Sequence, residues 1–225
     1  QRQMCIRDSH KAVDKVNLHI KKGAIYGFIG RNGAGKTTCL KMISGLARPT
    51  AGEIEMFGCK GKELERIRSR VGCLIEAPGL YGNMNAYTNL KIKCELFGIR
   101  KKGYIEDILE TVGLEGVGKK KTKHFSLGMK QRLGIGLALV GEPDLLVLDE
   151  PINGLDPQGI AEVRDTIQRL RDERNMTILI SSHILEELSK IATDYGIIHN
   201  GSLLQELTSC LLYTSDAADE EDSVD

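Results

Sequence analysis

The stretch "GRNGAGKTT", residues 30–38, decides the fold of this chain. It contains the pattern G-x-x-x-x-G-K-[ST], in which glycine-rich backbone turns its N–H groups inward around phosphate oxygens. An apolar segment, "AIYGFIG", precedes this loop, and "CLKMISGL", with apolar residues at helical spacing, follows it. Because a strand before the loop and a helix after it are the setting that the motif requires, a chance glycine turn is a poor explanation. The loop therefore predicts an α/β domain that binds a phosphorylated ligand.

Side chains that could bind phosphate or Mg²⁺, or orient an attacking water, occur in the glycine loop and after one buried strand. Lys36 can reach the β and γ phosphates of a nucleoside triphosphate, and the Thr37 hydroxyl can occupy a position on Mg²⁺. The apolar run "LLVL" ends at Asp149 and Glu150. Ligands of open α/β sheets lie beyond the carboxyl ends of strands. We therefore expect Asp149 to bind Mg²⁺ through water and Glu150 to orient the attacking water, the alternative being a merely solvated strand end.

A single histidine, His183, follows a second buried run, "ILISS". A lone histidine is more often structural than catalytic. Its place at a strand end, beside the expected position of the γ-phosphate, nevertheless makes it a candidate sensor of that phosphate.

Hydrophobic patterning predicts the remaining elements. The result is a mostly parallel α/β core over residues 10–209, with a small antiparallel sheet and a helical subdomain over about residues 80–136. The expected elements are a half-buried strand at Val16, Leu18 and Ile20, a strand in "GEIEMFG", helices in "AYTNLKIKCELFGI", "YIEDILETVGL" and "SLGMKQRLGIGLALV", a helix from Asp156-Pro157 to Arg174, a buried strand in "MTILISSH", a short helix in "ILEELSKIA", and a hairpin around Asn200-Gly201.

Composition sets limits on the class of protein. Of the 225 residues, 41% are hydrophobic and 28% charged, which is ordinary for a globular protein, and no apolar run approaches the ~20 residues of a membrane-spanning helix. The six cysteines form no CxxC pair, which argues against a zinc site or a disulfide framework and favours a reducing compartment. Residues 10–209 hold 29 basic and 24 acidic residues, a net charge of about +5. That charge alone does not imply nucleic acid.

Both ends of the chain differ in character from the rest. "QRQMCIRDS" and "CLLYTSDAADEEDSVD" resemble translated sequencing-adapter read-through, so residues 1–9 and 210–225 are expected to be non-native. A native disordered acidic tail is the alternative at the carboxyl end.

An unusual helix start lies at residues 124–136, "HFSLGMKQRLGIG". Ser126 is a good N-cap, yet Gly128, Gly134 and Gly136 follow, each costing about 1 kcal/mol against alanine in a helix interior. Glycine allows another backbone or a ligand to come close, and a helix N-terminus attracts anions. The pattern raises the question of which anion, or which neighbour, approaches this helix.

Taken together, the motifs resemble those of ABC-transporter ATPase subunits over about residues 11–205. "GRNGAGKTT" is similar to the family's Walker A motif, "LLVLDEP" to Walker B, "NGLDP" to the D-loop and "SSH" to the switch histidine. The resemblance implies Glu150 as the catalytic carboxylate, with His183 assisting it. The nucleotide-binding residues that it implies are Gly30, Asn32, Gly33, Gly35, Lys36, Thr37 and Thr38.

"SLGMKQ" resembles the family's signature motif, although Leu127 and Met129 replace the usual glycine and glutamine. The resemblance implies that Ser126 and Gly128 face the nucleotide held by an opposite subunit in a head-to-tail dimer, whether of identical or of different subunits. On this basis the anion at the helix start is the γ-phosphate of ATP bound to the partner.

Glu76 occupies a position where the family usually has glutamine close to Mg²⁺. Glutamate here, together with "SLGMKQRLGIG", resembles the bacitracin and lantibiotic exporters. Near the metal, Glu76 would add a negative charge that requires a cation or a proton nearby; the alternative is a solvated loop residue.

The resemblance implies an ATPase that uses ATP and Mg²⁺ and drives separate transmembrane permease subunits from the cytoplasmic face of the membrane, without nucleic acid. The aromatic residue that usually stacks on adenine is missing from residues 1–9. One alternative is a non-transport ABC ATPase of the translation-factor type whose second half has been lost. A P-loop kinase or GTPase is disfavoured, because it has no use for the signature helix and no N-K-x-D guanine motif occurs.

Overall fold

A six-stranded sheet with the strand order β4-β5-β6-β1-β7-β8 forms the centre of the computed structural model, which describes residues 11–209. The first five strands in this order run parallel, and β8 is antiparallel to β7. The predictions about residues 1–9 and 210–225 lie outside the described residues. The expected α/β class, with its additional small antiparallel sheet, is confirmed. The strands are β1 Ile25–Ile29, β2 Glu55–Met56, β3 Cys59–Lys60, β4 Val71–Leu74, β5 Leu145–Asp149, β6 Thr177–Ser182, β7 Asp194–His199 and β8 Ser202–Thr208.

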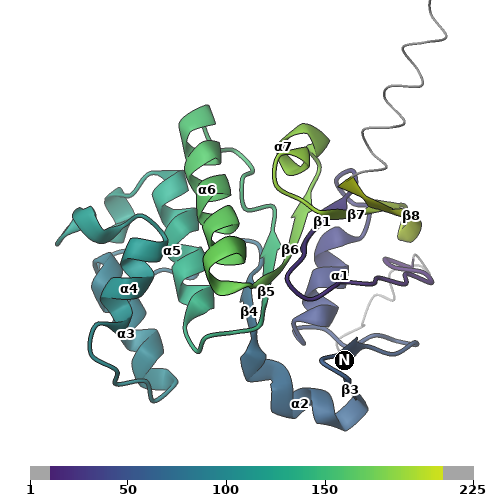
Figure 1. Ribbon diagram of the computed structural model, residues 1–225, viewed down its shortest axis with the longest axis horizontal. Coiled ribbons are helices and arrows are strands. Elements are labelled where there is room, and N and C mark those ends of the chain that lie inside the picture. Colours follow the sequence, from purple (N-terminus) through teal and green to yellow (C-terminus); the bar gives the residue numbers. More distant parts are fainter. Residues whose placement is uncertain (1–10, 210–225) are drawn as a thin grey trace, which may run out of the picture.

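Helices cover both faces of this sheet (Figure 1). Helix α1 lies on one side, α5 and α6 lie on the other, and α3 and α4 pack beyond α5. Among residues 11–209, no helix has the length and hydropathy needed to cross a membrane. The helices are α1 Lys36–Ile43, α2 Leu64–Ile67, α3 Ala86–Leu96, α4 Tyr104–Thr111, α5 Leu127–Leu139, α6 Pro157–Arg174 and α7 Leu185–Ser189, with short 3-10 turns η1 Gly61–Glu63, η2 Arg68–Arg70, η3 Glu115–Val117 and η4 Thr122–His124.

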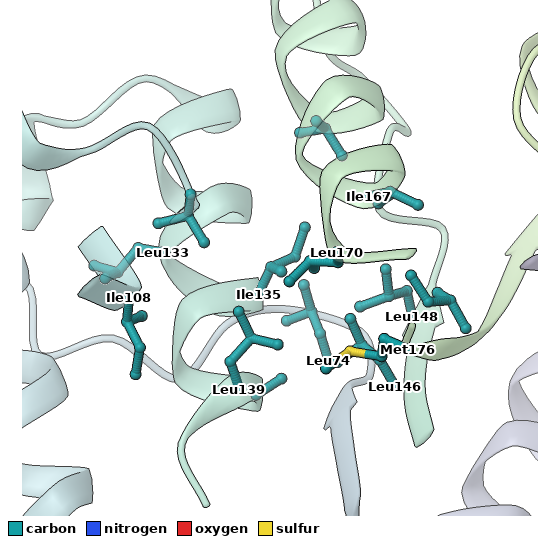
Figure 2. Packing of buried hydrophobic residues seen from close by; sticks show 14 of the residues in the cluster. Leu74, Ile108, Leu133, Ile135, Leu139, Leu146, Leu148, Ile167, Leu170 and Met176 are labelled. Atoms are coloured by element: carbon teal, nitrogen blue, oxygen red, sulfur yellow. The ribbon is translucent and has the colours of Figure 1, made fainter. Parts of the chain in front are cut away.

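Strand β5 shows why the central strands are apolar on both faces. Successive side chains of a strand point to opposite sides of the sheet. Leu146 and Leu148 accordingly join the cluster formed with α5 and α6, whereas Leu145 and Val147 join the cluster on the α1 side. Figure 2 shows Leu146 and Leu148 facing Leu170 of α6. Burial on both faces places β5 in the middle of the fold, and its polar carboxyl end lies at the edge of the sheet where the parallel strands end.

Local signals for helix starts and turns are confirmed. Ser126 Oγ accepts a hydrogen bond from Met129 N at 3.2 Å, and Asp156 caps α6, whose first residue is Pro157. Between β7 and β8, Asn200 and Gly201 have φ of 47° and 80°, as a tight hairpin turn requires.

The strand expected at Val16, Leu18 and Ile20 is wrong. These side chains are half-buried against the α1-side cluster, so the alternation was correctly identified, but the segment forms no strand. Its backbone bonds elsewhere: His19 N donates to the Glu206 carboxylate at 2.9 Å instead of joining a ladder. The strand in "GEIEMFG" is confirmed only over two residues, β2, and strand β4 and helix α2 were not predicted at all.

Two of the helix glycines serve packing between helices and sheet. A Cβ on Gly134 would lie 2.8 Å from Pro78 Cβ and 3.0 Å from Leu74 Cδ1, and a Cβ on Gly136 would lie 3.2 Å from Ile108 Cγ2. Helix α5 can therefore approach β4 and α4 only where side chains are absent, which accounts for the helix-propensity cost at these positions.

We expect Gly134→Val to lower the free energy of unfolding by about 1–3 kcal/mol, because the added side chain overpacks the contact with Leu74 and Pro78. Gly116→Val is the control, since its Cβ would meet open space and its effect should stay within about 0.5 kcal/mol. Urea denaturation monitored by circular dichroism measures both changes. Equal stability of the two variants would show that α5 does not require the close approach.

Candidate functional site

The glycine loop connects the carboxyl end of β1 to α1. Gly33 and Gly35 have φ of 81° and 105°, a left-handed conformation that favours glycine. A Cβ on Gly30 would lie 2.5 Å from Ile198 O, whereas one on Gly33 would meet open space. Because Gly35 caps α1 without a side chain, the first-turn N–H groups have no capping oxygen from it. Asn32 is exposed, and Thr38 is half-buried in that first turn.

The ammonium of Lys36 points back into the loop. Its side chain is only 6% exposed, and Nζ donates to Gly30 O at 2.6 Å and Arg31 O at 3.3 Å. The same Nζ lies 3.1 Å from Glu150 Oε1. Lys36 therefore places a fixed positive charge at the centre of the loop, and this charge is balanced by the carboxylate that follows β5, on the far side of β6 from the loop.

Thr37 and Asp149 bring two oxygen groups together. Thr37 Oγ1 donates to Asp149 Oδ2 at 2.8 Å, and Ser181 Oγ donates to Asp149 Oδ1 at 2.6 Å. The adjacent strands β1, β6 and β5 end at the same edge, which is why residues so distant in sequence meet here.

Glu150 and His183 form a second pair at the same edge. His183 Nδ1 and Glu150 Oε2 lie 2.8 Å apart. Glu150 has φ of 48°, and its N–H bonds to Ser181 Oγ at 2.9 Å, which fixes its backbone beside β6. A strained backbone conformation of this kind persists where the surroundings determine it, and such residues cluster at active sites.

These residues fit a nucleoside triphosphate and a divalent cation. The open space at Gly33, the exposed helix start and the buried ammonium of Lys36 are suited to phosphate oxygens. The Thr37 hydroxyl and Asp149 carboxylate are hard oxygen ligands held side by side, as Mg²⁺ prefers. Cys39, one turn into α1, does not contribute a nucleophile: burial raises the pKa of its thiol to about 11, so it stays protonated near neutral pH.

Glu76 follows β4 and forms an ion pair with a residue of α1. Its Oε1 lies 2.5 Å from Lys41 Nζ, and the two side chains are 66% and 36% exposed. Glu76 also has φ of 66°, so its backbone is held in the left-handed region. Lys41 thus supplies the cation that an extra carboxylate near the site requires, while a role for Glu76 at the metal stays a prediction.

The start of α5 lies apart from this cluster. Ser126 and Leu127 are exposed, and Gly128 is buried, with its Cβ position 3.4 Å from Gly159 Cα of α6. Among residues 11–209, no hydrogen bond or ion pair joins Ser126 or Gly128 to the loop residues. The structure therefore brings Lys36, Thr37, Asp149, Glu150 and His183 together and leaves the α5 start facing outward.

Two contributors were missed from the sequence. Ser181 is completely buried and bonds both Asp149 and the Glu150 backbone, and Lys41 pairs with Glu76. The signal for Ser181 was available, since a hydroxyl at the polar end of a fully apolar strand requires a hydrogen-bond partner. No local signal points from Lys41 to Glu76.

Comparisons with known proteins agree with this geometry. The family model described as "ABC transporter" matches residues 13–153. The Bacitracin transport ATP-binding protein BcrA of Bacillus licheniformis is 53% identical over 88% of this chain, and the chain spans 65% of the length of that relative. The Lantibiotic transport ATP-binding protein SrtF of Streptococcus pyogenes is 46% identical over 86% of this chain and 83% of its own length.

A solved structure described as the ATP binding subunit of an ABC transporter superimposes with a TM-score of 0.77 at 29% identity, covering 92% of this chain and 87% of that chain. The family match covers more than half of the chain, and SrtF matches it over most of both lengths. The chain therefore belongs to the ABC transporter family.

Proposed function

We propose that this protein is the ATP-binding and ATP-hydrolysing subunit of an exporter of peptide antibiotics. The observation that carries the proposal is the meeting of Lys36, the Thr37–Asp149 pair and the Glu150–His183 pair at one edge of the sheet. Lys36 is suited to the phosphates, the Thr37–Asp149 pair to the cation, and the Glu150–His183 pair to the attacking water. The names of the relatives BcrA and SrtF favour transport of bacitracin or lantibiotics over a non-transport ATPase.

In this proposal the chain's residues act by positioning and by charge. The loop N–H groups, from Gly30 to Thr38, and the Lys36 ammonium bind the β and γ phosphates. Mg²⁺ held by Thr37 and Asp149 would neutralise charge that develops on the phosphate oxygens. Glu150 orients a water molecule for attack on the γ-phosphate, and His183, 2.8 Å from its carboxylate, keeps that carboxylate in place.

A second ATP-binding subunit, identical or related, completes the site. The exposed start of α5 presents Ser126 and backbone N–H groups with the positive end of a helix dipole. We infer that it receives the γ-phosphate bound to the partner's loop. ATP would then hold two subunits together head to tail.

We expect Ser126→Arg to bind ATP as an isolated subunit and to fail in ATP-dependent dimerisation. The long cation would fill the space that the partner's triphosphate enters. Size-exclusion chromatography with ATP in a Glu150→Gln background measures the dimer, which should accumulate when hydrolysis is blocked.

Ser126→Ala is the matched control, because it loses the same cap to Met129 and the same hydroxyl without adding bulk, and it should keep more of the ATP-dependent dimer than Ser126→Arg. Gly128→Asp should fail like Ser126→Arg, since it adds bulk and a negative charge facing an anion. Its packing against Gly159 makes it the less specific variant. If Ser126→Arg dimerises with ATP as well as Ser126→Ala, the α5 start does not receive a partner's nucleotide.

We further propose that separate permease subunits hold this protein at the cytoplasmic face of the membrane. A cleft of about 390 Å³ between β4 and α3 supports a docking role, because its lining includes the exposed apolar side chains Leu46, Leu96 and Phe97. Leu96 alone is 79% exposed.

The transported substrate can be tested in cells. Expression together with a matching permease should raise resistance to bacitracin or a lantibiotic, and Lys36→Ala should abolish the gain. Resistance that survives Lys36→Ala, or no gain with any member of the two antibiotic classes, would contradict the proposed substrate class.

A further inference from the structure

Two neighbouring segments of the helical subdomain carry lysines and no carboxylates. Residues 77–94 and 116–141 contain no Asp or Glu, although the chain has 31 acidic residues. The segments are joined by backbone hydrogen bonds: Thr122 N donates to Met84 O at 2.8 Å, and Lys123 N donates to Gly82 O at 2.9 Å. Their side chains therefore share one fixed surface.

Four lysines on this surface have no countercharge. Lys119, Lys120, Lys121 and Lys123 are all exposed, and none forms an ion pair within residues 11–209. Several lysines elsewhere are neutralised; Lys60, for example, lies 3.1 Å from two glutamates. The turn η4 and the buried Thr122 side chain, which donates to Tyr81 O at 3.0 Å, hold the cluster in place.

Tyrosines border the lysines. Tyr81 and Tyr87 are 56% and 41% exposed, and Asn85, between them, bridges to Lys121. A tyrosine has an apolar ring and a polar tip, which suits the boundary between water and lipid, and lysine stems can lie along an apolar surface with the charge in water. The lysine surface is defined here as Lys119, Lys120, Lys121, Lys123 and Tyr87; Tyr81 also lines the cleft proposed for the permease and is therefore not counted in it.

We propose that the lysine surface binds the anionic phospholipid headgroups of the membrane. Anionic lipid attracts clustered lysines near the cytoplasmic leaflet, and Tyr87 matches its interface. Cytoplasmic loops of a permease carry an excess of Lys and Arg, so they would repel this surface. The inference rests on the proposed function only in that a permease would hold the protein near the membrane; the binding itself belongs to this chain.

The test is flotation of the purified protein with vesicles of phosphatidylcholine alone and of phosphatidylcholine with phosphatidylglycerol. Each lysine near an anionic surface contributes about fivefold to partitioning, so a variant with glutamine at all four lysines should bind the anionic vesicles at least about tenfold more weakly. A control with glutamine at Lys15, Lys22, Lys62 and Lys102, which are exposed and form no ion pair within residues 11–209, removes the same charge elsewhere and should stay within about twofold of wild type. Added salt should weaken wild-type binding.

Equal binding by the two quadruple variants, or wild-type binding to neutral vesicles as strong as to anionic ones, would overturn the proposal. Tighter binding to duplex DNA or RNA than to anionic vesicles at the same salt concentration would assign the surface to nucleic acid instead.

Phosphate release from ATP, measured without vesicles, separates lipid binding by the lysine surface from the proposed ATPase function. The lysine variant should keep this activity, whereas Lys36→Ala should lose it and still bind vesicles. Loss of phosphate release in the lysine variant would place the surface in the ATPase site, against the proposal.

Discussion

Glu150→Gln is expected to keep ATP binding and to reduce hydrolysis by about 10²–10⁴-fold. The substitution removes the negative charge that orients and polarises the attacking water, but it leaves the loop and Thr37 unchanged. Glutamine can still accept a hydrogen bond from His183, which lies 2.8 Å from the present carboxylate. Binding should not weaken, because the variant also removes the carboxylate that lies 3.1 Å from Lys36 Nζ and competes with phosphate for it.

Steady-state phosphate release from the reconstituted transporter measures this effect. Glu173→Gln, an exposed carboxylate of α6 paired with Arg169, is the control and should behave like wild type. Phosphate release by Glu150→Gln within tenfold of wild type would refute the catalytic assignment.

Lys36→Ala is expected to weaken ATP binding itself. The ammonium is the charge that the loop offers to the β and γ phosphates, and hydrogen bonds to charged groups contribute about 1.5–3 kcal/mol, which corresponds to a loss of about 10- to 150-fold in affinity. The change also leaves the Glu150 carboxylate, 19% exposed, without its cation, and so adds repulsion toward phosphate.

Calorimetric titration with a non-hydrolysable ATP analogue and Mg²⁺ measures the loss. Lys41→Ala removes a lysine of the same helix that pairs with Glu76 and lies outside the loop, so it should change the affinity far less. Unchanged affinity in Lys36→Ala would mean that the loop does not bind the triphosphate.

Much of the fold followed from the sequence where one local signal was sufficient. The strand before the glycine loop, the start of α6 at Pro157 and the turn at Asn200-Gly201 depend on burial of a run, a cap and a positive φ, all of which are local. Strand β4 was missed because its pattern "VGCL" is short, and it is a strand only because β5 pairs with it.

At Val16, Leu18 and Ile20 a correct local pattern led to a wrong secondary structure. The pattern correctly reported which side chains face the core, but a strand also needs a neighbour for its backbone groups. Here the Glu206 side chain accepts from His19 N, so no ladder forms. Periodicity therefore determines a face, and the available hydrogen-bond partner determines the secondary structure.

The sequence by itself determined which chemical groups the site contains: the loop glycines, Lys36, Thr37, the acids that end β5 and the histidine that follows β6. Only the tertiary structure decided how they are paired. The order β5-β6-β1 places three strand ends side by side, and this puts Glu150 between Lys36 and His183 and Ser181 under Asp149. The tertiary structure also showed that Gly134 and Gly136 allow α5 to pack closely on its neighbours and that Glu76 forms an ion pair with Lys41. Such contacts join residues far apart in the chain, and no local pattern encodes the distance between them.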